Sequence, residues 1–182
     1  PATTLLYALG MNQEEMLSYF YDTVVFSRDK KRSSWRVPFN PERLRGLKAN
    51  RNLVNAKTGK VVIEEGTKVT GRILRQLEEQ DVTELLVPDA DLNSRYVAVD
   101  IIDEETGLIY VEAGDEIDEE LLNKLLDGGI EDLPTIDVDH VTIGAYIRNT
   151  LAADKVNDRD RALVEIYRVM RPGEPPTEET AE

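Results

Sequence analysis

The sequence contains an internal repeat, and this repeat limits the fold more than any other feature of the chain. Residues 53–87 align without a gap with residues 101–135, at an offset of 48 positions. Seven of the 35 aligned pairs are identical, and seven more exchange one aliphatic residue for another. Turn glycines and helix leucines are among the identical pairs, so both copies keep one register. We infer a duplicated structural unit.

Each copy predicts the element order β-β-α-β. Two short aliphatic segments flank a Thr-Gly turn, where glycine adopts positive φ at no steric cost. A helix with apolar residues at helical spacing follows, and its first free N–H groups are capped by Thr70 in one copy and Asp118 in the other. An aliphatic strand then completes each unit. Two such units are typical of a compact protein-interaction or spacer module.

The segments on either side of the repeat predict a mainly helical frame. Residues 1–9 form a predicted helix that ends at Gly10, and Asn12 with Glu15 has the spacing of a capping box that opens a second helix. After the repeat we expect a helix over residues 141–151 and another that is capped by Asn157 or Asp158 and ends at Pro172 and Gly173. The residues expected on the buried faces are Met16, Leu17, Phe20 and Tyr21, then Tyr146, Ile147 and Leu151, and finally Ala162, Leu163, Ile166, Tyr167 and Met170.

A β-hairpin is predicted within the first part of the frame. Residues 23–26 and 35–39 are rich in β-branched and aromatic residues and flank a basic loop. Trp35, Val37 and Phe39 alternate onto one face. Pro38 has no backbone N–H, so we expect this strand at a sheet edge. The fold class is therefore α+β: a helical frame with a hairpin, interrupted by an inserted module of two β-β-α-β repeats.

Charge divides the chain in the same way. The whole sequence has 22 basic and 36 acidic residues, a formal net charge of −14. Residues 28–51 carry nine basic and two acidic side chains, whereas residues 52–147 carry seven basic and 23 acidic ones. This step predicts a first frame segment over 1–51, an acidic inserted module over 52–138 and a return segment over 139–182. The acidic surface excludes general nucleic-acid binding, because phosphates would be repelled.

The residue types exclude most enzyme classes. The chain has no Cys, which rules out disulfides, thiolate metal sites and a cysteine nucleophile, and it contains no phosphate-binding or nucleophile-elbow glycine motif. His140 follows Asp137 and Asp139, but zinc requires three or four ligands. Asp89, Asp91 and Asn93 imitate a calcium loop whose glycine and final glutamate are missing. Carboxylate pairs such as Glu104-Glu105 are typical of solvated surfaces. We expect no catalytic residue, metal site or cofactor in this chain.

Neither a membrane span nor a secretory leader is predicted. No apolar run approaches the roughly 20 residues that cross a bilayer, and the sequence does not begin with a charged and then apolar segment. A cytoplasmic location is expected. Both ends are typical of a piece cut from a longer protein, because the sequence begins within a helix and ends at Pro-Pro-Thr-Glu-Glu, a helix start.

Two groups of basic residues are candidates for contacts with nucleic acid. The cluster at 28–51 includes Trp35 and Phe39, so it is either a phosphate-contacting hairpin or a solvated loop. The second group lies toward the end of the chain and consists of Arg148, Arg161, Arg168 and Arg171. The last three have helical spacing and are expected on one flank. Pairing with Asp158 or Glu165 is an equally good interpretation of these arginines.

Three stretches of the frame resemble the beta subunit of bacterial DNA-directed RNA polymerase. PATTLLYALG at 1–10 resembles the start of its lobe helix, and PERLRG at 41–46 resembles the segment that leads into a lineage-specific insertion. NDR at 157–159 and ALVEIYRVMRPGEPPT at 162–177 resemble the return helix of the lobe and the stretch after it. The sequences of residues 1–10 and of GAYIRNTL at 144–151 are similar to those of alphaproteobacterial members of the family.

The resemblance implies that this chain is the beta lobe with its external insertion, within a multisubunit nucleotidyltransferase. In that family the lobe walls the downstream DNA cleft, and the insertion projects outward and contacts regulators. The implied partners are the alpha, beta-prime, omega and sigma subunits and downstream DNA. The catalytic Mg²⁺ of the family is held by beta-prime, so the fragment alone is expected to catalyse nothing. Arg171 is the first candidate for DNA contact and Arg168 the second.

Two other classes of function fit the residues less well. A free-standing acidic adaptor explains the repeat, but not the long match near the end of the chain. A small hydrolase built on paired carboxylates has no positioned nucleophile or base partner.

Overall fold

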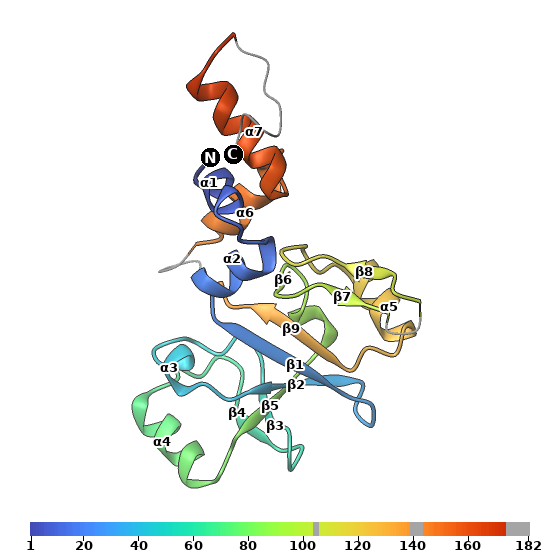
Figure 1. Ribbon diagram of the computed structural model, residues 1–182. Helices are drawn as coiled ribbons and strands as arrows, with labels where there is room; N and C mark the ends of the chain where they lie inside the picture. The colour runs from blue at the N-terminus through green and yellow to red at the C-terminus, as the bar shows by residue number, and fades with distance from the viewer. Residues whose placement is uncertain (104–105, 139–143, 174–182) are drawn as a thin grey trace. The chain divides into compact units, whose positions relative to one another are not determined.

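A computed structural model of the chain describes residues 1–103, 106–138 and 144–173 (Figure 1). The chain forms two compact units, each assembled from separate segments. We call Pro1–Thr23, Tyr96–Glu116 and Ile136–Glu182 the helical unit, and Val24–Arg95 with Ile117–Thr135 the sheet unit. The predicted class, α+β, is confirmed. The three-part division at residues 51 and 138 stays a prediction, and the compact units cross both of these boundaries.

Within its described residues, the helical unit combines four helices with three short strands. Its elements are α1 (Ala2–Ala8), α2 (Gln13–Phe20), β6 (Tyr96–Val97), β7 (Ile101–Ile102), β8 (Ile109–Val111), α6 (Tyr146–Ala153) and α7 (Arg159–Met170). The predicted capping box is present: the Glu15 N–H donates to Asn12 Oδ1 at 2.8 Å, and the Asn12 N–H donates to Glu15 Oε2 at 2.9 Å. Asp158 caps α7 by accepting from the Arg161 N–H at 2.8 Å. Local capping chemistry therefore sets where these helices start.

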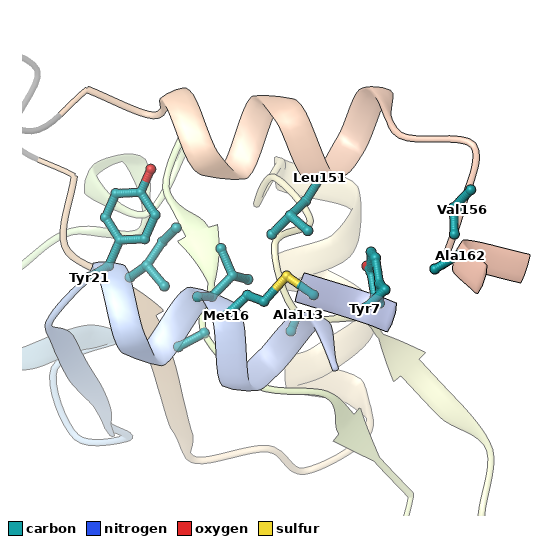
Figure 2. Packing of buried hydrophobic residues seen from close by; sticks show 10 residues of the cluster. Tyr7, Met16, Tyr21, Ala113, Leu151, Val156 and Ala162 are labelled. Atoms are coloured by element: carbon teal, nitrogen blue, oxygen red, sulfur yellow. The ribbon is translucent and has the colours of Figure 1, made fainter. Parts of the chain in front are cut away.

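The core of the helical unit lies where α1, α2, α6 and α7 meet (Figure 2). Met16 and Leu17 are fully buried on α2, and they pack with Tyr7, Leu151 and Ala162 from the other three helices. These residues share one apolar cluster although they come from both ends of the chain. Burying a side chain of this size contributes about 1.5–3 kcal/mol. The cluster therefore fixes α7, which carries Arg161 and Arg168, two of the four candidate arginines.

Three residues expected in the core are instead exposed. Phe20, Tyr146 and Met170 are 39%, 77% and 75% exposed. Each is the first or last residue of its helix, where the apolar stripe extends past the neighbouring helices. Phe20 packs edge-on against the exposed ring of Tyr19, with the ring centroids 5.2 Å apart. Residues 141–143 of the helix predicted over 141–151 lie outside the described residues.

The sheet unit is built on a largely antiparallel sheet with the strand order β4-β3-β5-β2-β1-β9. The elements of this unit are β1 (Thr23–Asp29), β2 (Ser34–Pro38), α3 (Pro41–Leu44), β3 (Leu53–Asn55), β4 (Val61–Ile63), α4 (Gly71–Glu79), β5 (Glu84–Val87), the 3₁₀ helix η1 (Asp89–Asp91), α5 (Glu119–Asp127) and β9 (Asp132–Ile136). The predicted hairpin is therefore β1–β2. Leu44 of α3 packs on an apolar cluster that includes Leu74 and Leu77 of α4.

The predicted edge position of the second hairpin strand is wrong. β2 lies between β1 and β5, and Pro38 pairs with Glu84 of β5. The pairing between β1 and β2 ends at Ser27 and Arg36, two residues before Pro38. A proline is tolerated here because its missing N–H falls beyond the end of the β1–β2 ladder.

The repeat is confirmed element by element, since β3-β4-α4-β5 corresponds to β7-β8-α5-β9. Backbone hydrogen bonds recur at the same offset of 48, and the side-chain caps of α4 and α5 also correspond. Positive φ values recur as well, at positions 46 and 94, 59 and 107, 66 and 114, and 81 and 129. The structural repeat thus begins before residue 53, at position 44 in one copy and 92 in the other, where equivalent hydrogen bonds (47 to 44, 95 to 92) are formed.

The two copies differ in how their strands are used. In the first copy β3 pairs with both β4 and β5 in the main sheet. In the second copy β7 and β8 form a separate two-stranded sheet that belongs to the helical unit, whereas α5 and β9 belong to the sheet unit. The duplicated sequence therefore contributes to both compact units.

Candidate nucleic-acid interface

The candidate arginines of α7 are placed by the cap and by the buried face of that helix. Ala162 faces the core, which leaves Arg161 and Arg168 exposed at positions two helical turns apart. Arg161 Nε lies 3.4 Å from Asp158 Oδ2, and Arg168 Nη1 lies 3.5 Å from Glu165 Oε2. These are the pairings that the sequence left open. Both are exposed i,i+3 ion pairs, and the attraction between the two side chains of such a pair is weak.

Arg161 and Arg168 line one cavity of about 640 Å³ within the helical unit. The rest of its lining comes from α1, from α7 and from the segment that follows α6. Three cations and three carboxylates face this space: Lys155, Arg161 and Arg168 against Asp154, Asp160 and Glu165. Because the charges are balanced, the cavity is not a dedicated phosphate pocket. It does confirm that the two arginines share a flank of α7.

Asp154 joins α1 to the end of α6 beside this cavity. Its Oδ2 accepts from the hydroxyls of Thr3 at 2.5 Å and Thr4 at 3.2 Å, and its Oδ1 accepts from the Val156 N–H at 3.2 Å. Burial by itself raises the pKa of Asp154, but these hydrogen bonds outweigh it and the pKa is lowered overall. Asp154 is therefore a structural carboxylate, held in its ionised form.

Arg171 lies at the C-terminal end of α7. It follows the last helical residue, and its backbone N–H donates to the Tyr167 carbonyl at 2.8 Å. The Arg171 guanidinium lies over the Tyr167 ring, with Cζ 5.6 Å from the ring centroid. Gly173 then turns the chain with φ of +101°. Arg171 is exposed, so a cation is presented at the end of the helix. Residues 174–177 of the PGEPPT stretch lie outside the described residues.

Arg148 does not lie with the other three arginines. Its Nε donates to the Gly114 carbonyl at 2.7 Å, and its Cζ lies 4.2 Å from the centroid of the Tyr96 ring. Gly114 follows β8 and Tyr96 belongs to β6, so Arg148 ties α6 to the strands of the helical unit. These contacts give Arg148 a structural role that its sequence position did not reveal.

Trp35, one of the two aromatic residues of the basic cluster, is unsuited to base stacking. Trp35 is completely buried, and its Nε1–H donates to Asp89 Oδ1 at 2.9 Å. Arg28 pairs with the same carboxylate and lies 5.1 Å from the centroid of the Trp35 ring. Sequence reasoning missed this cluster because Asp89 is 54 residues from Trp35. The carboxylates that imitate a calcium loop are thus used as ion-pair partners, and Asp91 likewise pairs with Arg51.

A second half-buried cation, Arg95, was also missed. Arg95 lies over the Phe26 ring, with Cζ 4.9 Å from the centroid, and its Nε donates to the Asp91 carbonyl at 2.8 Å. Burial, and then the nearby charge of Arg43, lowers the pKa of Arg95. Nothing in the sequence distinguishes this arginine from an exposed one.

No metal centre is present within residues 1–103, 106–138 and 144–173, where no three His, Asp or Glu side chains are grouped to hold an ion. His140, Asp139 and the Glu104-Glu105 pair lie outside the described residues. The helices that are described lack the length and apolar character needed to cross a bilayer.

Curated relatives of the chain are beta subunits of DNA-directed RNA polymerase. The subunit from Rhizobium leguminosarum bv. trifolii is 52% identical over 182 residues, which is all of this chain and 13% of that protein. The chain corresponds along its whole length to a segment of the RNA polymerase beta subunit. The subunits of Dinoroseobacter shibae and Caulobacter vibrioides are each 50% identical and also match the whole chain, which covers 14% and 13% of their lengths. No protein-family profile matches the chain.

The comparisons confirm the resemblance seen in the sequence, including its alphaproteobacterial character. The alignments to the beta subunits cover the whole chain and therefore include the repeat as well as the frame. An independent acidic adaptor does not account for such a match. The chain spans only 13–14% of the length of these relatives.

Proposed function

We propose that this chain is the beta lobe of a DNA-directed RNA polymerase, together with the lobe's external insertion, and that it walls the downstream DNA cleft during transcription. The observation that carries this proposal is the match of about 50% identity along the whole chain to beta subunits. Its implied partners are the alpha, beta-prime, omega and sigma subunits in a cytoplasmic, nucleoid-associated enzyme.

Within this proposal, the exposed end of α7 faces the DNA. Arg171 is the first candidate because it is exposed at the C-terminal end of the helix, and Arg168 follows one turn earlier. Arg161 is a weaker candidate because its guanidinium is engaged with both Asp158 and Asn157. Arg148 is the weakest of the four, since its guanidinium contacts Gly114 and Tyr96.

The chain's contribution is positional rather than chemical. The resemblance to the beta subunit family implies that the catalytic Mg²⁺ is held by the beta-prime subunit, and we propose that this chain contributes no ligand to it. An exposed arginine at the DNA wall stabilises the complex by displacing counterions from phosphates, a contribution that weakens as salt increases. The acidic second copy of the repeat would face away from the DNA, where it is available to transcription regulators.

Arg171→Ala in the assembled polymerase tests this proposal. We expect the promoter complex to have a shorter lifetime. We also expect the slope of log affinity against log salt to decrease by about the value for one phosphate contact. Lys124→Ala is the matched control, because it also removes one exposed cation but lies in the acidic second copy of the repeat. An unchanged lifetime and an unchanged salt slope for Arg171→Ala would remove Arg171 from the interface.

A further inference from the structure

The two copies of the repeat share a fold but carry opposite charge. Residues 44–87 contain eight basic and six acidic side chains, a net charge of +2. Residues 92–135 contain two basic and 13 acidic side chains, a net charge of −11. The acidic character of the inserted module therefore comes from its second copy. Because the backbone hydrogen bonds of the copies correspond, the charge difference is a difference in surface and not in fold.

Five of the seven exposed cations of the first copy form a group that we call the basic face: Arg45, Lys48, Lys68, Arg72 and Arg75. At the equivalent positions the second copy has no cation. The five counterparts are Asn93, Tyr96, Glu116, Glu120 and Asn123, in the same order. One scaffold thus presents a basic surface in its first copy and a neutral to acidic surface in its second.

Contacts within the sheet unit make the basic face continuous. Lys48 and Lys68 are partners in an antiparallel bridge, so their side chains are direct neighbours. The Arg45 guanidinium lies beside the start of α4, since a Cβ added to Gly71 would be 3.5 Å from Nη2. Arg72 and Arg75, one turn apart on α4, line a shallow depression together with Gly71. The face therefore runs from the bridge past the end of α3 and along α4.

The cations of the basic face are not neutralised within the described part of the chain. None of the five side chains makes an ion pair with another residue among 1–103, 106–138 and 144–173. Like charges directly opposite each other in a sheet are destabilising, and the Lys48–Lys68 pair has that arrangement. The counterpart pair, Tyr96 and Glu116, avoids the repulsion. An anionic partner would relieve it in the first copy.

We propose that the basic face binds the phosphate backbone of duplex DNA. Protein–DNA interfaces are more polar and far more positive than protein–protein interfaces, whose centres are apolar and depleted in charge. The basic face has one exposed large apolar residue at its edge, Leu47, which lies between Arg45 and Lys48 in the sequence. A row of cations without an apolar centre fits a phosphate backbone better than an acidic protein. This proposal rests on the assignment of the chain to RNA polymerase.

The repeat allows a direct test of this proposal. Each cation of the basic face can be replaced by the residue at the equivalent position of the second copy, which the same fold already accommodates. The exchange variant combines Arg45→Asn, Lys48→Tyr, Lys68→Glu, Arg72→Glu and Arg75→Asn in the full-length beta subunit, assembled into polymerase. The control variant lowers the net charge by the same amount at five exposed lysines outside the face: Lys30→Gln, Lys31→Glu, Lys57→Gln, Lys60→Glu and Lys124→Gln. Assembly and transcription on a short primed template are measured first, which tests the polymerase assignment independently.

Binding of the assembled enzymes to a labelled 100-base-pair promoter duplex is then measured between 50 and 200 mM salt. If the face contacts three phosphates, the slope of log affinity against log salt decreases by about 2.7 in the exchange variant. Over this range the wild-type affinity should therefore fall about 40-fold more than that of the exchange variant. The control variant should keep the wild-type slope. Equal slopes for the exchange variant and the wild type would overturn the proposal.

Crosslinking keeps the proposal testable if the exchange variant fails to assemble. A photoreactive phenylalanine analogue replaces Arg75 in one enzyme and its counterpart Asn123 in another, both in complex with the same duplex. We expect crosslinks to DNA from position 75 and none from position 123. Crosslinks from position 75 to protein alone would overturn the proposal and identify the face as a protein contact.

Discussion

Replacing Arg148 by Ala should destabilise the helical unit, and the structure gives the size of the effect. The substitution removes the charged hydrogen bond from Nε to the Gly114 carbonyl, a type worth about 1.5–3 kcal/mol. It also removes the contact with the Tyr96 ring at 4.2 Å, worth about 0.5–1 kcal/mol at a partly exposed site. We expect a loss of about 2–4 kcal/mol in the free energy of unfolding. For a chain of this size, 3 kcal/mol lowers Tm by about 6–12 °C.

Thermal unfolding of the 182-residue chain measures this loss, with Arg161→Ala as the matched control. Arg161 forms an exposed pair with Asp158 and should cost less than about 1 kcal/mol. Arg148→Lys keeps the charge but not the planar guanidinium, so it should recover only part of the stability. The reasoning would be refuted if Arg148→Ala and Arg161→Ala lowered Tm equally.

Three further predictions concern the repeat and Asp154. Gly66 and Gly114 are equivalent and both have positive φ, but a Cβ on Gly114 would lie 3.0 Å from Gln13 Nε2 and one on Gly66 would meet no atom within 4 Å. Gly114→Ala should therefore lower Tm more than Gly66→Ala; equal shifts would contradict the packing. Asp118→Ala removes the cap of α5 and should cost about 1 kcal/mol in urea unfolding, whereas no change would show that the cap is dispensable. Because the pKa of folded Asp154 is lowered, its ionised form stabilises the fold above the ordinary value of 3.8, and this stabilisation is lost as pH falls through the folded-state pKa. Unfolding compared at pH 7 and pH 3 should show that Asp154→Asn is less stable than wild type at pH 7 and that the gap narrows at pH 3; a constant gap would contradict the assignment.

Local features of the fold were predictable from the sequence because local chemistry determines them. The Asn12–Glu15 capping box, the caps at Thr70 and Asp118 and the element order of both repeats all formed as expected. Each depends on residues that are close in sequence and on backbone groups that must find a partner. The repeat strengthened the prediction, since two copies of one pattern had to fold alike.

Features that depend on distant partners were not predictable. The edge position predicted for the strand of Pro38 is wrong because β2 pairs with β5, whose residues lie about 50 positions further along the chain. Trp35, which its sequence position makes a candidate for base stacking, is buried against Asp89. The guanidinium of Arg148, the weakest of the four candidates for DNA contact, lies against Gly114 and Tyr96. In each case the residue type was informative, but its partner came from elsewhere in the chain.

The most direct test of the central claim is to locate this chain in the cells that make it. An antibody raised against residues 1–182 is used to probe native extract and purified transcribing complexes. The account predicts one band much larger than 20.6 kDa that co-purifies with DNA-dependent polymerase activity. A free band near 20.6 kDa that is absent from those complexes would contradict it.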